Sequence, residues 1–234
     1  MHQIHSEIAD LSAGQFQSAV RVQQSFVTAA EKNVLLWLAE RTPPRIHSDH
    51  LTALGAVGML LAGASYGLAR YTRYGLMLAC FFLGVNWLGD SLDGTLARFR
   101  RRQRPRYGYY VDHVIDCFGA TVLLLGISLS GYMAAPIAAA LLIAYLLLSS
   151  EIFLATYALG RFEMSYLRMG PTELRILLCA RNLYLFFHPA AHPFSLSITL
   201  FDFGGIAGAA GLLAIAVVSA VRHGRELYLI ERLP

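Results

Sequence analysis

Charge is scarce in this sequence, and lysine is almost absent. Only 15% of the 234 residues are charged, whereas 56% are hydrophobic; soluble domains have about 25% charged residues. Eighteen of the 19 basic residues are arginine, and most of them stand at the ends of apolar blocks. Positive charges in that position flank membrane helices, and they leave no soluble basic face for nucleic acid. The composition predicts an integral membrane protein.

Cysteine is rare as well. The three cysteines, Cys80, Cys117 and Cys179, each lie inside an apolar block. An odd number in such surroundings excludes a small secreted scaffold held by disulfides. We expect all three to be buried, as small hydrophobic residues are.

Six apolar blocks approach the roughly 20 residues that a membrane-spanning helix needs. They cover about 51–69, 74–98, 109–131, 134–158, 172–188 and 197–221. Ahead of them, apolar side chains recur at helical spacing over residues 8–38, which predicts an amphipathic helix on the membrane surface. An arm that packs on a partner protein is the alternative. The predicted fold is all-α and polytopic, with the surface helix in 1–44 and a six-helix transmembrane domain in 45–234.

The arginines predict the orientation. Five of the nine residues in the connection 99–107 are arginine, which places this connection in the cytoplasm. With six spans, the N-terminus, the 160–171 connection and the C-terminal tail then lie on the same side. Arg70 and Arg73 lie on the opposite side and break the pattern.

Four of the seven aspartates fall between residues 90 and 116, at the facing ends of the second and third predicted spans. Asp90 and Asp93 share one helix face, as do Asp112 and Asp116. Carboxylates at membrane depth are costly unless they are paired or bind a cation, so they indicate function. An all-oxygen set favours Mg²⁺ or Mn²⁺, and two such ions are suited to holding a pyrophosphate.

The residues around these aspartates fit a phosphate ligand. Gly94, Ala97 and Gly108 leave space beside the carboxylates, and Arg98 offers a cation to phosphate oxygens. Structural pairing of aspartate with arginine at a helix end is the alternative. It would account for one pair and not for four spaced aspartates.

The stretch from Asp90 to Asp116 resembles the signature of the CDP-alcohol phosphotransferases. That signature reads D-x-x-D-G-x-x-A-R, eight or nine residues, G-x-x-x-D-x-x-x-D, and every fixed position matches. The resemblance implies a homodimeric integral membrane enzyme. With the arginine-rich connection in the cytoplasm, we expect its active site to face the cytoplasm from the cell (inner) membrane. An acceptor hydroxyl would attack the pyrophosphate of a CDP-alcohol, and CMP would leave. Residues 45–234 would then be the catalytic domain.

The resemblance also implies roles for individual residues. Metal binding falls to Asp90, Asp93, Asp112 and Asp116, and Asp116 is also the candidate base for the acceptor's proton. The CDP site falls to Gly94, Ala97, Arg98 and Gly108. Many members carry a Pro-Asn pair before a threonine at the start of the first span. Here His47-Ser48-Asp49-His50 precedes Thr52, so within this stretch Thr52, and not Asp49, is expected to contact the nucleotide.

Two branches of the family differ in which substrate carries the CDP. His113 after Asp112, and the pair Thr172-Glu173, are similar to residues of the choline/ethanolamine phosphotransferases, where the His and Glu are candidate acid–base partners. They favour CDP-choline or CDP-ethanolamine as donor and diacylglycerol as acceptor. The short chain argues for the alternative, in which CDP-diacylglycerol reacts with inositol, inositol phosphate, glycerol phosphate or serine. His113 bonded to a carbonyl and Glu173 at a helix N-terminus are the non-catalytic interpretations.

Two other classes of membrane protein could also carry clustered aspartates. A membrane prenyltransferase also binds pyrophosphate through aspartates, but on two distant motifs, and a cation transporter would not need the small residues and Arg98. Gly63-x-x-x-Gly67 and Gly204-x-x-x-Gly208 permit close helix packing, within one chain or in a dimer. No spacing assigns a role to Glu151. Four arginines are candidates for an acceptor's phosphate or for lipid head groups: Arg161, Arg168, Arg175 and Arg181.

Overall fold

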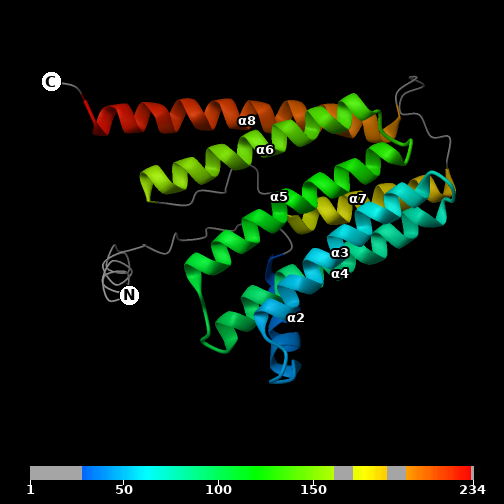
Figure 1. Ribbon diagram of the computed structural model, residues 1–234, viewed down its shortest axis with the longest axis horizontal. Coiled ribbons are helices and arrows are strands. Elements are labelled where there is room, and N and C mark those ends of the chain that lie inside the picture. Colours follow the sequence, from blue (N-terminus) through cyan, green and yellow to red (C-terminus); the bar gives the residue numbers. More distant parts are fainter. Residues whose placement is uncertain (1–27, 161–170, 189–198, 233–234) are drawn as a thin grey trace, which may run out of the picture.

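The computed structural model describes residues 28–160, 171–188 and 199–232, with side chains from residue 31 onward, and its regular structure is entirely helical (Figure 1). The helices are α2 (Thr28–Arg41), α3 (Ser48–Ala69), α4 (Tyr74–Phe99), α5 (Pro105–Leu129), α6 (Ala135–Leu159), α7 (Pro171–Phe187) and α8 (Leu200–Ile230). The predicted all-α class is confirmed. Arg161 and Arg168 lie outside the described residues.

Five of these helices are long and apolar enough to cross a membrane: α3, α4, α5, α6 and α8. The polytopic membrane architecture is therefore confirmed. Helix α7 occupies the predicted fifth span, but its 17 residues fall short of the roughly 20 that a complete crossing needs. The count of six spans stays a prediction.

Glycine lets α3 approach its two neighbours closely. A Cβ added at Gly89 of α4 would lie 2.5 Å from the carbonyl oxygen of Leu51 on α3, and one at Gly58 would lie 2.7 Å from the backbone nitrogen of Asn86. On the other side, a Cβ at Gly126 of α5 would collide with the backbone of Gly63. These backbone contacts align α4 and α5 along α3. Gly63 thus packs within the chain, and the homodimer stays a prediction.

A short turn joins α4 to α5 and brings the two halves of the aspartate motif to one end of the bundle. The Arg102 backbone N–H donates to the Ala97 carbonyl at 2.9 Å, and Arg101 adopts a left-handed φ of 54°. Pro105 begins α5, a position that suits its fixed φ. The Arg100 side chain donates to the carbonyls of Thr42 and Ile46, at 2.7 and 2.5 Å. Part of the arginine-rich connection is therefore structural.

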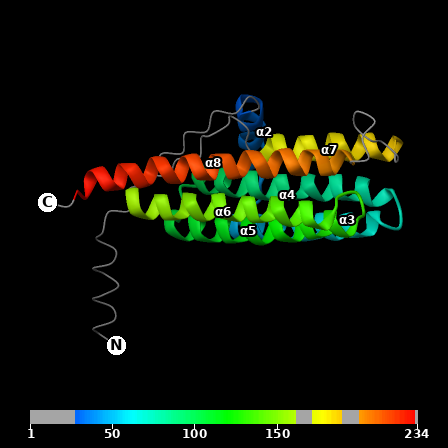
Figure 2. The ribbon, with the colours of Figure 1, turned by 90° about the horizontal axis from the view of Figure 1, so that it is seen from above.

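Helix α2 lies across the end of α4 that carries this turn (Figures 1 and 2). It buries Leu35 and Ala39 in a cluster with residues of α3 and α4. Trp37 remains 53% exposed. The described part of the segment predicted as an amphipathic helix, residues 28–38, is helical, and the helix continues to Arg41; residues 8–27 lie outside the described residues. Its place on the membrane surface stays a prediction.

Helix α7 is anchored by one buried amide. Asn182 is fully buried, and its side chain hydrogen-bonds the Tyr66 hydroxyl of α3 and the Leu76 carbonyl of α4. Asn182 and Arg175 are seven residues apart, so they share one face of α7. The anchor therefore sets the position of Arg175 at the other end of the helix.

Cys179 and the other two cysteines are free and only partly buried, which corrects the expected full burial.

Helices α6 and α8 form a parallel pair (Figure 1). The Ala134 N–H donates to Asp202 at 2.7 Å, and the Ser219 hydroxyl donates to Glu151 at 2.8 Å; both contacts join residues 68 positions apart. Glu151 also contacts Nδ1 of the buried His223 at 2.7 Å. This polar cluster between the two helices accounts for Glu151.

Candidate active site

Three of the four motif aspartates converge. Carboxylate oxygens of Asp90, Asp112 and Asp116 all lie within 4.8 Å of one another, and the three residues are partly buried. Asp90 comes from α4, whereas the other two stand one turn apart on α5. Like charges this close repel strongly unless a cation lies between them. Partly buried carboxylates with only oxygen donors fit a hard divalent cation.

The fourth aspartate of the motif has a different partner. Asp93 accepts a hydrogen bond from the Thr52 hydroxyl of α3 at 2.5 Å, and another from the backbone N–H of Gly94. It is nevertheless close enough to Asp90 and Asp112 for their charges to interact. Thr52, expected at the nucleotide, thus lies directly beside the carboxylates. Both assignments, metal binding by Asp93 and nucleotide contact by Thr52, stay predictions.

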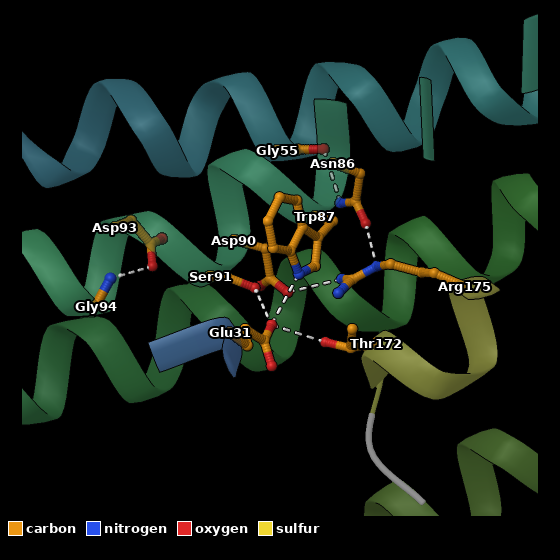
Figure 3. A network of polar contacts seen from close by, with 10 residues as sticks. All are labelled: Glu31, Gly55, Asn86, Trp87, Asp90, Ser91, Asp93, Gly94, Thr172 and Arg175. Carbon is orange, nitrogen blue, oxygen red and sulfur yellow. Dashed lines mark hydrogen bonds and ion pairs between the residues drawn. The ribbon is translucent and has the colours of Figure 1, made fainter. Parts of the chain in front are cut away.

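Arg175 of α7 holds Asp90 in place (Figure 3). Its NH2 group donates to an Asp90 oxygen at 2.7 Å, and its Nε donates to the Asn86 side-chain oxygen at 2.8 Å. The Asn86 amide in turn donates to the Gly55 carbonyl at 2.9 Å. The side chains of Arg175 and Asp90 are 12% and 27% exposed, so solvent screens this ion pair only partly. The ion pair joins α7 to α4 at the carboxylate cluster, and the Asn86 amide extends the network to α3.

A second network reaches the cluster from α2. Glu31 accepts hydrogen bonds from Trp87 at 2.7 Å, from Ser91 at 3.3 Å and from Thr172 at 3.0 Å, all on its Oε1 atom (Figure 3). Sequence reasoning missed Glu31 and Asn86. Asn86 lies one turn before Asp90, which is a usable signal, but no spacing connects Glu31 to the motif.

Residues of both networks and of the carboxylate cluster line one cavity of about 570 Å³. Ten of the eleven predicted site residues line it: Thr52, Asp90, Asp93, Gly94, Ala97, Arg98, Gly108, Asp112, His113 and Asp116. Glu31, Lys32, Arg102, Arg104, Thr172 and Arg175 line it as well. Apart from the adjacent backbone of α5, no atom of the described residues lies within 4 Å of a Cβ added at Gly108, whereas one at Gly94 would lie 3.3 Å from the Arg98 guanidinium. Gly108 therefore faces open space, as a ligand site requires.

The two candidate acid–base residues are placed differently. His113 lines the cavity, its Nδ1 lies 2.7 Å from the Tyr109 carbonyl oxygen, and its ring packs on the Tyr109 ring with centroids 4.1 Å apart. Glu173 is not among the residues that line this cavity, although the neighbouring Thr172 is. The roles of both residues stay predictions. Arg181 lies away from the cavity and stacks on Phe201 of α8 at 4.7 Å.

Comparison with known proteins agrees with this geometry. A match to the CDP-alcohol phosphatidyltransferase family covers residues 46–220, which include the whole motif. The chain is also 36% identical over 92 residues to a Drosophila melanogaster protein named ceramide phosphoethanolamine synthase; the match covers 37% of this chain and 22% of that protein. The chain thus spans about a fifth of the length of this curated relative. On the family match, which extends over most of its length, the chain belongs to the CDP-alcohol phosphatidyltransferase family, a family of transferases of phosphate-containing groups.

Proposed function

We propose that the protein transfers the phospho-base of CDP-choline or CDP-ethanolamine to the hydroxyl of diacylglycerol and releases CMP. The observation that carries the proposal is the convergence of Asp90, Asp112 and Asp116 in a cavity lined by the rest of the motif. A site of this kind suits a pyrophosphate. His113 on the cavity wall supports the phospho-base branch. So does the name of the relative, which joins phosphoethanolamine to the lipid ceramide.

Asp90, Asp112 and Asp116 would hold one divalent cation, Mg²⁺ or Mn²⁺, and Asp93 would share a second. Bound there, the ions would offset the charge of the pyrophosphate and the charge that develops as it is cleaved. Arg175 keeps the Asp90 carboxylate oriented for this role through its 2.7 Å contact. Arg98 supplies a fixed positive charge to phosphate oxygens.

The reaction needs a base beside the attacking oxygen. The acceptor oxygen forms a bond to the phosphorus on the alcohol side, the bond from that phosphorus to the bridging oxygen breaks, and CMP leaves with the electron pair. Asp116 receives the hydroxyl proton, because it lines the cavity within the carboxylate cluster and is within reach of an oxygen that attacks there. Gly108 leaves space for the nucleotide beside it.

We place the end of the bundle that carries the motif at the cytoplasm, in the cell membrane. Arg100, Arg101, Arg102, Arg104 and Arg106 all lie in or beside the α4–α5 turn at this end. Anionic lipid head groups and the positive-inside bias both favour that side for an arginine-rich turn. The CDP-alcohol, a soluble nucleotide in the phospho-base branch, would then enter from the cytoplasm.

The test is CMP release by the purified protein with Mg²⁺ or Mn²⁺. CDP-choline or CDP-ethanolamine is offered with diacylglycerol, and CDP-diacylglycerol is offered separately with inositol, inositol phosphate, glycerol phosphate or serine. We expect CMP from the phospho-base donors, loss of it with a chelator or in Asp116→Ala, and no loss in Glu40→Ala, an exposed position on α2. CMP from CDP-diacylglycerol alone would overturn the proposed branch and establish the alternative.

A further inference from the structure

Glu31 is a carboxylate on the wall of the catalytic cavity that lies outside the aspartate motif. The Oε1 atom of its side chain accepts three hydrogen bonds from described residues, Trp87, Ser91 and Thr172. Among the residues that the structure describes, none donates to the other oxygen, Oε2 (Figure 3). One oxygen therefore joins α2 to α4 and α7, and the second is left for a ligand.

Glu31 lies next to the carboxylate cluster of Asp90, Asp112 and Asp116. Ser91, which donates to it, directly follows Asp90 in α4. Thr172, which also donates to it, is one turn before Arg175, whose guanidinium binds Asp90. Figure 3 shows the Glu31 carboxylate beside these groups. A ligand held by its phosphate at the cluster would thus place its nearest substituent at Glu31.

The order of residues along α4 indicates which substituent that is. Gly94, Ala97 and Arg98, assigned to CDP, come after Asp90 and lead toward the α4–α5 turn, whereas Trp87 and Ser91 flank Asp90 on the Glu31 side. With the reacting phosphorus at the aspartates, cytidine extends toward the turn. Glu31 contacts α4 three residues before and one residue after Asp90, so it lies level with the reacting phosphate, where the alcohol of the donor begins.

We propose that Oε2 of Glu31 binds the ammonium group of CDP-ethanolamine and thereby selects a primary ammonium over the trimethylammonium of CDP-choline. The proposal rests on the proposed function. A primary ammonium has N–H groups that a carboxylate oxygen accepts in a charge-assisted hydrogen bond. Trimethylammonium has no N–H and is bound best by aromatic faces. The two-carbon arm of ethanolamine keeps its nitrogen close to the phosphate.

The variant Glu31→Gln separates recognition of the ammonium group from the hydrogen bonds that join α2 to α4 and α7. Its side-chain oxygen can still accept from Trp87, Ser91 and Thr172, whereas its amide nitrogen replaces Oε2 and repels a cation. We expect the ratio of kcat/KM for CDP-ethanolamine to kcat/KM for CDP-choline to fall about tenfold, the value of one charge-assisted hydrogen bond. The ratio cancels any general damage to the enzyme.

Two further variants complete the experiment. Thr172→Val removes one hydrogen-bond donor to Oε1 but keeps the Glu31 carboxylate. It should therefore leave the ratio of kcat/KM for CDP-ethanolamine to kcat/KM for CDP-choline unchanged. Glu40→Gln makes the same substitution at an exposed position of α2 and should change neither constant. An unchanged ratio in Glu31→Gln, with a wild-type protein that turns over both donors, would overturn this inference alone. A wild-type protein that turns over neither phospho-base donor would overturn the proposed function instead.

Discussion

Gly89→Ala tests whether the contact between α3 and α4 positions the active site. Gly89 directly precedes Asp90, and the added methyl group would lie 2.5 Å from the Leu51 carbonyl oxygen and 2.6 Å from the Gly55 Cα. Ordinary contacts of carbon atoms are about 3.5–4.0 Å. Both neighbours are backbone atoms of α3, so no side-chain rotation relieves the clash. The two helices must separate locally by about 1 Å.

The expected loss of stability follows from two opposing terms. Overpacking typically costs about 1–3 kcal/mol, and a clash between two backbones belongs at the upper end. Replacing glycine by alanine within a helix returns about 1 kcal/mol. The net destabilisation is therefore about 2 kcal/mol, which lowers Tm by about 4–8 °C in a protein of this length. Displacing Asp90 by about 1 Å should lower CMP release about a hundredfold.

Gly84→Ala is the matched control, because it lies on the same helix and, in the part of the chain that the structure describes, its added Cβ meets no atom within 4 Å beyond the backbone of α4 itself. It should keep full activity and an equal or slightly higher Tm. Thermal unfolding of the detergent-purified proteins and CMP release measure both effects. If Gly89→Ala matched Gly84→Ala in Tm and activity, the close approach of α3 and α4 at Asp90 would be wrong.

Two further predictions concern polar contacts. Arg175→Met removes the guanidinium from Asp90, and we expect kcat/KM for CMP release to fall at least about tenfold, the value of a charge-assisted hydrogen bond. Arg175→Lys should have a kcat/KM between those of the wild type and Arg175→Met. Wild-type activity of Arg175→Met would refute the positioning role. Glu151→Ala removes the carboxylate that Ser219 and His223 of α8 both contact, so Tm should fall by about 4–8 °C. The activity of the folded fraction should be retained, because Glu151 is not among the residues lining the cavity. A Tm equal to that of the wild type would contradict the reported α6–α8 cluster.

Hydropathy and local spacing were sufficient to predict much of this protein. Apolar blocks predicted the long helices, since length and composition are properties of each segment alone. The intervals within Asp90–Asp93 and Asp112–Asp116 predicted shared helix faces, and the short α4–α5 turn predicted that the two pairs meet. Helix α7 is harder to classify as a membrane span from hydropathy, because it is only 17 residues long and contains polar residues.

The tertiary structure alone decided which groups complete the site. It brings Thr52 to Asp93 across 41 residues, Arg175 to Asp90 across 85, and Thr172 to Glu31 across 141. It also groups Asp90 with the two α5 aspartates, while Asp93 turns to Thr52. Such pairings depend on how deeply α2, α3 and α7 pack against α4, which is set by glycine contacts and by the Asn182 anchor. Those contacts join distant segments, so no periodicity within one helix encodes them.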